Sequence, residues 1–482
     1  MTEILSDATL NRVPAGVERP AYDRQAARIG VVHVGPGAFH RAHQAHYFDR
    51  LLATDPRWAV SAVSLRSGGV TDALAPQDGL YTLAELDERV GFRVIGALTE
   101  LLSAARDPEA VLARLAHPDI HIVTMTVTEK GYCLAGDGTL DLGHPDIRHD
   151  LAHPHAPVSL PGHLVEGLRR RRAAGLRPFT AISCDNLVDN GRKLGAAVAA
   201  LARATDPALA DWIEAEGAFP ATMVDSITPA TDDDLKARVR GALGLDDAWP
   251  IQRESFTQWV VEDRFAGERP DLASVGVTLT SDVRAFDRAK LRLLNGPHSS
   301  LAYLGSLLGL ETVGEAMRDP DLAGFVGRLV REDMLPTVAA PPDFDLGAYV
   351  DAILKRFRNP AIRHLLSQIA WDGSQKLPFR ILGTVADALA SGRPVERLCL
   401  PLAAWMHFVR RAAKDGRAIV DPLADRLVEI GRACDGSTAD VARFLDLTGV
   451  FAPDIAQDPR FRTALEGAYA ALERDVRGAL VP

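Results

Sequence analysis

The chain has 482 residues and a formal net charge of −10 at pH 7, and 47% of its residues are hydrophobic and 24% charged. This composition is typical of a soluble globular protein and excludes a disordered one, and the length predicts two or three domains. The acidic balance argues against nucleic acid as the main partner, because it provides no overall attraction for a polyanion.

No stretch of about 18 uninterrupted apolar residues occurs, so we expect no membrane span. The amino terminus, MTEILSDATLNR, is polar and lacks the apolar run of a signal peptide. The four cysteines, Cys133, Cys184, Cys399 and Cys434, lie far apart and form no CxxC motif. Together these features predict a protein of the reducing cytoplasm, and they leave open whether it is a monomer or a homo-oligomer.

Over the first half of the chain, short apolar runs alternate with amphipathic stretches, the pattern of βαβ units around a parallel sheet. Helices are expected between the strands, at 41–52, 108–115 and 161–174. The strands are expected at 28–34, 58–65, 119–127, 177–183 and about 219–227. Residues 1–286 are therefore predicted to form an α/β nucleotide-binding domain.

A glycine-containing turn follows the first expected strand. Glycines there would let the backbone approach a pyrophosphate at the start of a helix, although a lone GxG also occurs in many ordinary turns. His40 stands where the GxGxxG pattern has its third glycine. The candidate cofactor-binding residues of this turn are Gly35, Pro36, Gly37, Ala38 and Phe39.

The acid that usually holds the ribose hydroxyl, about 20 residues further on, is missing at the end of the second strand. The chain there continues Ser64-Leu65-Arg66-Ser67-Gly68. Arg66 and Ser67 could instead accept a 2′-phosphate, so the choice between NAD and NADP stays open.

Three histidines, His40, His43 and His46, recur at three-residue spacing in HRAHQAH. On a helix these positions drift by about 60° each, so the first and third side chains diverge. No carboxylate or cysteine is interleaved at a ligand spacing. We therefore expect packing and hydrogen bonding near the glycine turn, and no metal site.

After about residue 287 the pattern changes to long helical segments, so residues 287–482 are predicted to form a mainly helical domain. A cleft between the two domains is the default place for chemistry. The candidate catalytic residues Lys290, Asn295 and His298 lie in KLRLLNGPHS. On an α-helix they would lie at roughly 0°, 140° and 80°, so one broad face could carry all three.

These residue types suit proton transfer from an alcohol. A lysine deprived of water can act as a general base near neutral pH, an Asn amide can donate to a developing oxyanion, and His can hold a hydroxyl. A solvated helix face is the alternative, but the flanking LRLLN and SSLAYLGSLLG are too apolar for it. Asn186, past the strand ending at 183, could add a second amide donor, and Lys376 lies in the polar turn DGSQKLP.

Together the segments resemble the long-chain mannitol dehydrogenase family, polyol-specific dehydrogenases that work without zinc. The resemblance implies a Rossmann-like first domain, a helical second domain and NAD as cofactor. It also implies that Lys290 is the general base, Asn186 and Asn295 the oxyanion pair, and His298 and Lys376 substrate contacts. The matching segments are GPGAFHRAHQA, LAPQDGLYTL, TVTEKGY, SCDNL, FPATMVDSITPAT, FTQWVVEDRF, KLRLLNGPHS and DGSQKLP.

One departure and one ambiguity follow from this resemblance. Ser226 replaces the arginine of the family's usual VDRITP segment. Mannitol-type members tend to have TEGGY, whereas members acting on hexuronates, such as fructuronate reductases (D-mannonate oxidoreductases), are similar to the TEKGYC found here. Lys130, next to Glu129, could pair with a substrate carboxylate, or it could be a solvated loop residue. We expect D-mannonate and D-fructuronate as substrates; the alternative is mannitol 2-dehydrogenase activity on D-mannitol and D-fructose, or a related polyol activity.

Two other classes of protein remain to be weighed. Lys290 could form a Schiff base in an aldolase-like enzyme, which borohydride trapping would reveal. A nucleotide sensor without catalytic activity is also conceivable, but it would not need two Asn donors and a buried lysine. The expected partner is thus a small sugar acid or polyol, and neither a membrane nor a nucleic acid.

Overall fold

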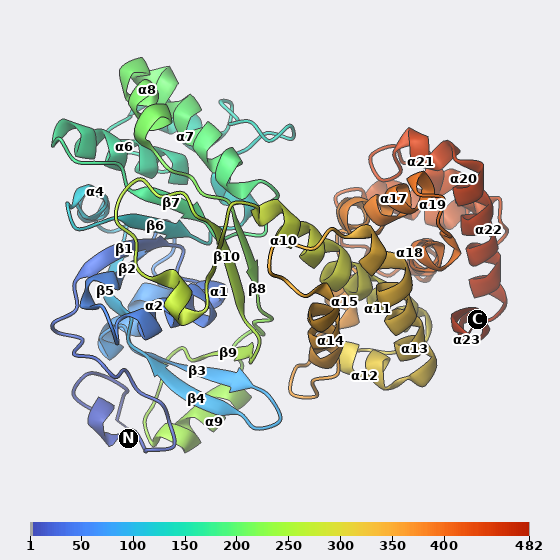
Figure 1. Ribbon diagram of the computed structural model, residues 1–482, viewed down its shortest axis with the longest axis horizontal. Coiled ribbons are helices and arrows are strands. Elements are labelled where there is room, and N and C mark those ends of the chain that lie inside the picture. Colours follow the sequence, from blue (N-terminus) through green and yellow to red (C-terminus); the bar gives the residue numbers. More distant parts are fainter. Residues whose placement is uncertain (1–2, 482) are drawn as a thin grey trace. The chain divides into compact units, whose positions relative to one another are not determined.

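The computed structural model describes residues 3–481, and the chain divides into two compact units between Val283 and Arg284 (Figure 1). The boundary expected from the sequence lies after residue 286. Each unit is described by itself. No helix among the described residues has both the length and the apolar character needed to cross a membrane.

The first unit is built on a five-stranded parallel sheet with the order β5-β2-β1-β6-β7. The chain runs from β1 to β2 and β5 on one side, and then to β6 and β7 on the other, so the order reverses at β1. Open α/β sheets bind ligands beyond the carboxyl ends of the strands at such a switch point. The strands are β1 (Ile29–Val34), β2 (Ala59–Ser64), β5 (Leu98–Ser103), β6 (Ile122–Met125) and β7 (Thr180–Ser183).

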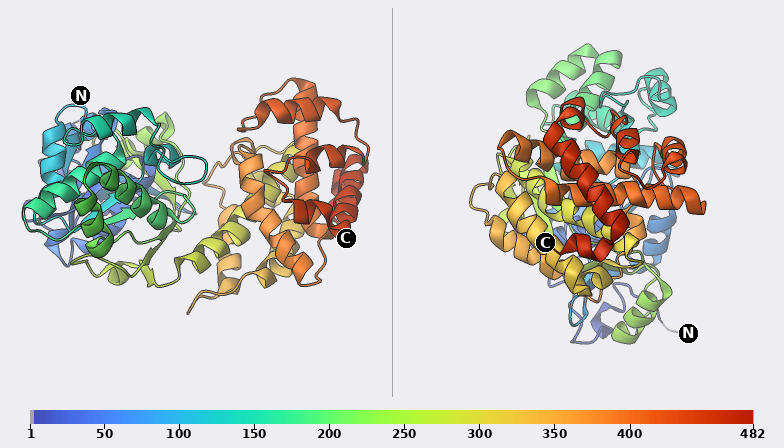
Figure 2. Two further views of the ribbon diagram at one scale, coloured as in Figure 1. Left: turned by 90° about the horizontal axis from the view of Figure 1, so that it is seen from above. Right: turned by 90° about the vertical axis from the view of Figure 1, so that its right-hand side faces the viewer.

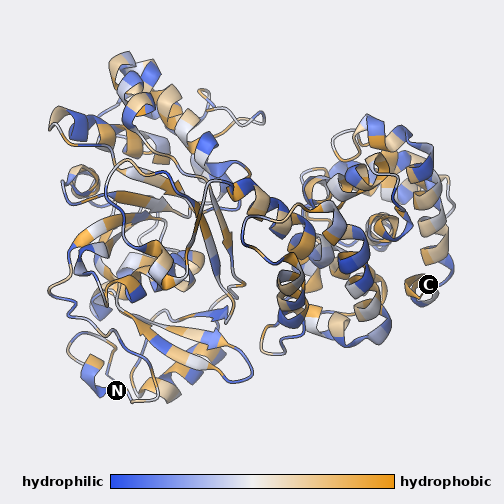
Figure 3. Cartoon of the chain, viewed as in Figure 1, coloured by the Kyte–Doolittle hydropathy of each residue, from blue (hydrophilic) through white to orange (hydrophobic). Residues whose placement is uncertain are grey.

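Helices cover both faces of this sheet, which explains why its strands are predominantly apolar. One core includes Val31 of β1 and Phe48 of α2. The other includes Val32 of β1 and side chains of α4, α6 and α7. In Figure 3 much of the sheet is correspondingly coloured as hydrophobic. The helices are α1 (Ala38–Ala42), α2 (Gln44–Leu51), α4 (Pro108–Ala116), α6 (Leu160–Ala173), α7 (Asn190–Thr205) and α8 (Pro207–Glu216).

The helix expected at 41–52 is wrong in one respect, because the chain breaks into α1 and α2 at His43. The backbone of His43 has φ −118° and ψ −88°, which is not helical. Its ring packs on Phe39, with 4.9 Å between the ring centroids, and its Nε2 lies 2.9 Å from the Gln258 carbonyl oxygen. These tertiary contacts accompany the break in a segment whose sequence suggests one continuous helix.

Two small sheets were not expected from the sequence. The first has the order β4-β3-β9 and the second β11-β10-β8. Only β8, within the strand expected at about 219–227, was foreseen. Their strands are β3 (Tyr81–Leu86), β4 (Gly91–Ile95), β8 (Thr222–Asp225), β9 (Ile251–Glu254), β10 (Gln258–Glu262) and β11 (Thr278–Thr280), and α9 (Asp233–Leu243) lies between β8 and β9 in sequence.

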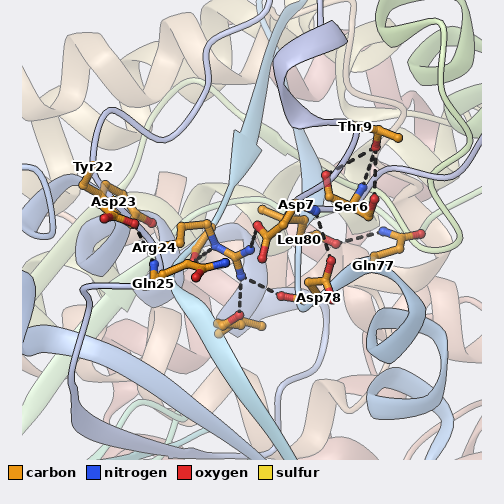
Figure 4. A network of polar contacts seen from close by, with 12 residues as sticks. Ser6, Asp7, Thr9, Tyr22, Asp23, Arg24, Gln25, Gln77, Asp78 and Leu80 are labelled. Atoms are coloured by element: carbon orange, nitrogen blue, oxygen red, sulfur yellow. Dashed lines mark hydrogen bonds and ion pairs between the residues drawn. The ribbon is translucent and has the colours of Figure 1, made fainter.

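Hydrogen bonds and an ion pair of Arg24 connect the amino-terminal segment to the rest of the first unit (Figure 4). Its Nε donates to the Gly96 carbonyl at 2.9 Å, and its guanidinium also donates to the Leu98 carbonyl at 3.1 Å. It forms an ion pair with Asp7, whose own backbone N–H donates to the Asp78 carboxylate at 3.0 Å. The segment before β1 is therefore an integral part of the unit.

The second unit is helical: its described residues form no strand of the three sheets (Figures 1 and 2). Its longest helix, α18 (Glu396–Asp415), packs against α11 (Gly296–Leu307), α19 (Ala424–Ala433) and α22 (Pro459–Arg474). Around them lie α12 (Val313–Arg318), α13 (Pro320–Arg328), α14 (Leu346–Phe357), α16 (Gly373–Leu377) and α17 (Gly383–Ala390).

Candidate active site

The glycine turn after β1 is shaped for close approach by a ligand. Gly35 has φ +86°, and a Cβ there would lie 2.3 Å from the Thr126 carbonyl oxygen, so only glycine fits. A Cβ on Gly37 would meet nothing nearer than 3.9 Å. The turn therefore leaves space beside the start of α1, and the residues present fit a dinucleotide pyrophosphate.

A cavity of about 490 Å³ lies at the carboxyl ends of β1, β2 and β6. Gly35, Pro36 and Gly37 line it, as do Arg66 and Ser67 after β2. Ala38 and Phe39, which the sequence also assigned to cofactor binding, begin α1 instead, where Phe39 packs against the core. The structure thus brings most of the candidate cofactor-binding residues to one pocket.

A buried histidine that the sequence reasoning missed supports the turn. His33 on β1 has its Nε2 3.2 Å from the Gly35 carbonyl oxygen and its Nδ1 2.8 Å from Thr124 Oγ1. Thr126 Oγ1 donates to the same Gly35 carbonyl at 2.7 Å. Burial lowers the pKa of His33 to about 3, so the ring is neutral and acts as a fixed hydrogen-bonding support.

The three histidines of HRAHQAH are buried, and each has its own packing contacts. His40 stacks on His33 with 3.3 Å between ring centroids, and His43 bonds to the Gln258 carbonyl. His46 packs edge-on against Tyr47. Burial lowers the pKa of both His40 and His46 well below the usual value. These contacts account for the motif through packing.

The segments TEKGY and SCDN are joined by Asp185. Its carboxylate accepts hydrogen bonds from the backbone N–H groups of Val127 and Thr128, each at 3.0 Å, and from the Tyr132 hydroxyl at 2.7 Å. Thr128 has φ 64°, a strained conformation for a non-glycine residue. Asn186, the candidate oxyanion donor, follows Asp185 directly and is exposed. The hydrogen bonds of Asp185 therefore fix the backbone immediately before Asn186.

Glu129 and Lys130 follow β6 in a short helical turn, and both are exposed. Lys130 lines the same pocket as Gly35 and Arg66. Its side chain makes no hydrogen bond or ion pair within residues 3–481. This cation can therefore meet an anion that enters the pocket.

In the second unit, Lys290 to Asn295 form a π-helical stretch, η6, between α10 (Val283–Ala289) and α11. Lys290 is only 5% exposed. The α-helical spacing expected from the sequence is therefore wrong here. In an α-helix, residues five apart point about 140° from each other, whereas a π-helix pairs residues i and i+5 through its hydrogen bonds. The π-helix thus brings Lys290 and Asn295 toward a common face.

The segment with Lys376 packs on this stretch. Its continuation, the π-helical η9 (Pro378–Leu382), contacts both η6 and α11. A Cβ on Gly296 would lie 2.8 Å from the Arg380 carbonyl oxygen, so this glycine permits the close approach. Lys376 itself donates from Nζ to the Trp371 carbonyl at 2.6 Å. The unit therefore collects Lys290, Asn295 and Lys376 on packed elements.

His298 lies one turn into α11 and is 7% exposed. Its ring stacks on Phe357, with 4.4 Å between centroids, and meets His364 edge-on at 5.0 Å. Burial, together with His364, Arg380 and Arg356, lowers its pKa well below the usual value. Its Nε2 has no hydrogen-bond partner among the described residues, so the neutral ring can bond to a substrate hydroxyl.

Both units match models of one family. The mannitol dehydrogenase Rossmann domain matches residues 29–274, and the mannitol dehydrogenase C-terminal domain matches residues 282–473. The chain belongs to the mannitol dehydrogenase family. It is accordingly an oxidoreductase acting on CH–OH groups, and the expected Rossmann-like fold with a helical second domain is confirmed.

Individual relatives within the mannitol dehydrogenase family differ in substrate. The chain is 42% identical to the D-mannonate oxidoreductase of Escherichia coli K12 over 96% of the chain and 97% of that protein. It is 40% identical to the mannitol 2-dehydrogenase of Phaeosphaeria nodorum over 95% of the chain and 81% of that protein. The match with D-mannonate oxidoreductase does not by itself separate the two substrates.

Solved structures in the mannitol dehydrogenase family share the fold over the whole chain. One is the Pseudomonas fluorescens mannitol 2-dehydrogenase in ternary complex with NAD and D-mannitol, 38% identical with a TM-score of 0.84, covering 99% of this chain and 98% of that one. Another is a D-sorbitol dehydrogenase in substrate-free form, 35% identical with a TM-score of 0.92, covering 99% and 100%.

The departure from the mannitol dehydrogenase pattern at Ser226 lies just past β8. The Ser226 hydroxyl donates to the Phe256 carbonyl at 3.1 Å, so it is engaged in a local backbone contact. The arginine usual in the family is thus replaced by a short hydroxyl side chain, which contacts the backbone at Phe256.

One further cluster was not foreseen. Cys133, His144 and Asp146 each offer a ligand atom, and these atoms lie within 4.8 Å of one another, the one such group found among residues 3–481. Burial raises the pKa of the Cys133 thiol to about 11, and Asp146 is ion-paired with Arg66. A protonated thiol does not favour a metal ion.

Proposed function

We propose that this protein interconverts D-mannonate and D-fructuronate with NAD(H), using Lys290 as the general base. The observation that carries the chemistry is the buried Lys290 on a π-helix with Asn295 five residues later. The similarity to the E. coli D-mannonate oxidoreductase supports the substrate class.

The residues that would hold the coenzyme are those of the glycine turn. The backbone of Gly35, Pro36 and Gly37 lies against the 490 Å³ pocket, where a pyrophosphate fits, and Arg66 borders the same pocket. Ala38 and Phe39 are the first residues of α1. The backbone N–H groups at the start of a helix point toward its N-terminus, which here adjoins the glycine turn. When bound, NAD supplies the acceptor for the hydride that leaves the alcohol carbon.

Lys290 would take the proton of the secondary alcohol at its Nζ during oxidation and return it during reduction. A buried ammonium loses its hydration, so an uncharged amine that accepts a proton is compatible with this position. General bases contribute about 10²- to 10⁴-fold in rate. No metal is needed for this step, because the amine removes the proton directly.

The amides of Asn186 and Asn295 would donate to the alcohol oxygen as it gains negative charge. Such donors act chiefly in the transition state, where the charge is greatest. Asp185 supports the first of them by fixing the backbone before Asn186. The π-helix supports the second by turning Asn295 toward the side of Lys290.

His298 and Lys376 would position the substrate. The neutral ring of His298 offers an unpartnered nitrogen to a hydroxyl, and the stacked Phe357 holds the ring in one orientation. The Lys376 ammonium, 26% exposed in its side chain, can donate to further oxygens. These contacts suit a polyhydroxylated chain.

Lys130, with Glu129 beside it, is proposed to pair with the substrate carboxylate. Its unpaired ammonium in the pocket wall is the observation in favour of a sugar acid. Mannitol 2-dehydrogenase activity is the second candidate, favoured by the P. nodorum and P. fluorescens relatives.

A substrate screen tests the proposal. Purified protein with NADH is offered fructuronate, tagaturonate, fructose and xylulose, and the oxidation of NADH is followed. The proposal expects the highest kcat/KM with fructuronate. Changing Lys130 to Met should then lower that value by roughly 10-fold or more, the worth of a charged hydrogen bond, with far less effect on fructose. A wild-type preference for fructose would favour the mannitol assignment.

A further inference from the structure

The end of β2 carries a cation where NAD-binding folds place an acid. Rossmann enzymes that bind NAD hold the ribose 2′-hydroxyl with a carboxylate there, whereas an arginine accommodates the 2′-phosphate of NADP. Here Ser64, Leu65, Arg66 and Ser67 line the pocket. No Asp or Glu is among the residues that line it within the described part of the chain.

The guanidinium of Arg66 is accessible and already binds an anion. Its side chain is 73% exposed, and it forms an ion pair with Asp146, whose side chain is 27% exposed. An exposed pair of this kind contributes little to stability. A phosphate dianion offers Arg66 more charge and a bidentate geometry, so it can displace the Asp146 carboxylate at small cost.

The two cations that line the pocket, Arg66 and Lys130, lie on opposite sides of β1. Arg66 follows β2, which pairs with β5 on one side of β1, while Lys130 follows β6 on the other side of β1. In Rossmann folds the residue that binds the adenosine ribose follows the glycine turn by about 20 residues, at the end of the second strand, which is β2 here. Arg66 therefore lies on the side of the pocket where an adenosine ribose would be expected.

We propose that this pocket accepts the 2′-phosphate of NADP(H) at Arg66 and the Ser67 hydroxyl, in addition to NAD(H), with Asp146 as an internal competitor for the guanidinium. This inference rests on the proposed dinucleotide function. Asp146 then tunes the coenzyme preference: while it holds Arg66, it disfavours the phosphorylated coenzyme.

Binding of coenzyme fragments tests this without relying on turnover. Affinities for adenosine 2′,5′-bisphosphate and for 5′-AMP are measured by titration calorimetry on the full chain. Wild type should bind the bisphosphate more tightly. Arg66→Met should reduce that preference by about 10-fold or more, the worth of a charged hydrogen bond, and Asp146→Asn should increase it. The ratio of kcat/KM for NADPH and NADH should move in the same directions.

Arg57→Met is the matched control. Arg57 is also an exposed arginine ion-paired with an aspartate, Asp55, but it lies before β2, at the other end of the strand. Its substitution should leave the preference for the bisphosphate unchanged. Unchanged affinity for 5′-AMP in the Arg66 variant shows that the variant is folded.

Equal affinity of wild type for the two nucleotides, with NADH still oxidised, would overturn this inference alone. A preference that survives Arg66→Met would also overturn it, because the phosphate would then lie elsewhere. Failure to bind either nucleotide or NADH would overturn the dinucleotide function as well.

Discussion

Replacing Gly296 with Ala tests whether the approach of the Lys376 segment to the π-helix is required for activity. In an ordinary helix this change stabilises by about 0.5–1 kcal/mol, because alanine loses less conformational freedom on folding. At Gly296 the new Cβ would lie 2.8 Å from the Arg380 carbonyl oxygen and 3.0 Å from Met334 Cε. Carbon contacts are favourable only at about 3.5 Å or more, so η9 must move by roughly half an ångström.

Two effects should follow from that displacement. Overpacking should cost about 1–3 kcal/mol in the free energy of unfolding. For a unit of this size, each kcal/mol lowers Tm by about 2–4 °C. Since a 1 Å misplacement can cost about 10²-fold in rate, kcat should fall by about 10-fold while coenzyme affinity is retained.

The assay compares Tm from calorimetry and kcat for Gly296→Ala with those for a control, Gly467→Ala. Gly467 lies in the middle of α22, and a Cβ there meets nothing within 4 Å. The control should keep wild-type kcat and a Tm equal to or above that of wild type. A Gly296→Ala protein that behaves like the control would refute the claim that the close contact positions the site.

Three further outcomes are expected. Asn186→Ala and Asn295→Ala should each lower kcat by about 10²-fold or more with coenzyme affinity nearly intact; an increase in substrate KM alone would make that residue a simple binder. Stability should decline as pH falls below about 6.5, because burial lowers the folded-state pKa values of His33 and His298, so the unfolded chain takes up protons first. The stabilisation from keeping these two histidines neutral is complete above about pH 6.5. A Tm that stays constant from pH 7.5 to 5 would contradict this prediction. Activity should survive exhaustive dialysis against EDTA; loss that zinc or manganese restores would show a metal requirement.

Much of the fold could be predicted from the sequence because its signals are local. Runs such as β1 are buried and apolar apart from His33, since both faces of the sheet are covered. The small sheets escaped detection because strands such as β3 and β9 are far apart in sequence: Glu85 pairs with Arg253, 168 residues further along the chain. Local pattern contains no information on such pairing.

The candidate site was predictable in residue type and less so in geometry. The apolar setting of KLRLLNGPHS correctly indicated that Lys290 is buried. The π-helical turn was not predictable, because α and π hydrogen bonding share the same local sequence preferences. Asp185 was passed over although it precedes Asn186, since only the folded chain shows its bonds to Val127 and Thr128. The roles of these residues remain predictions.

The most direct test of the central claim is the turnover of Lys290→Ala with saturating coenzyme and substrate. The account predicts a loss of about 10²-fold or more, the range for a general base, and partial recovery when primary amines are added. Lys355→Ala, at an exposed lysine of α14, is the control and should retain full turnover. Near-normal turnover of Lys290→Ala would contradict the account.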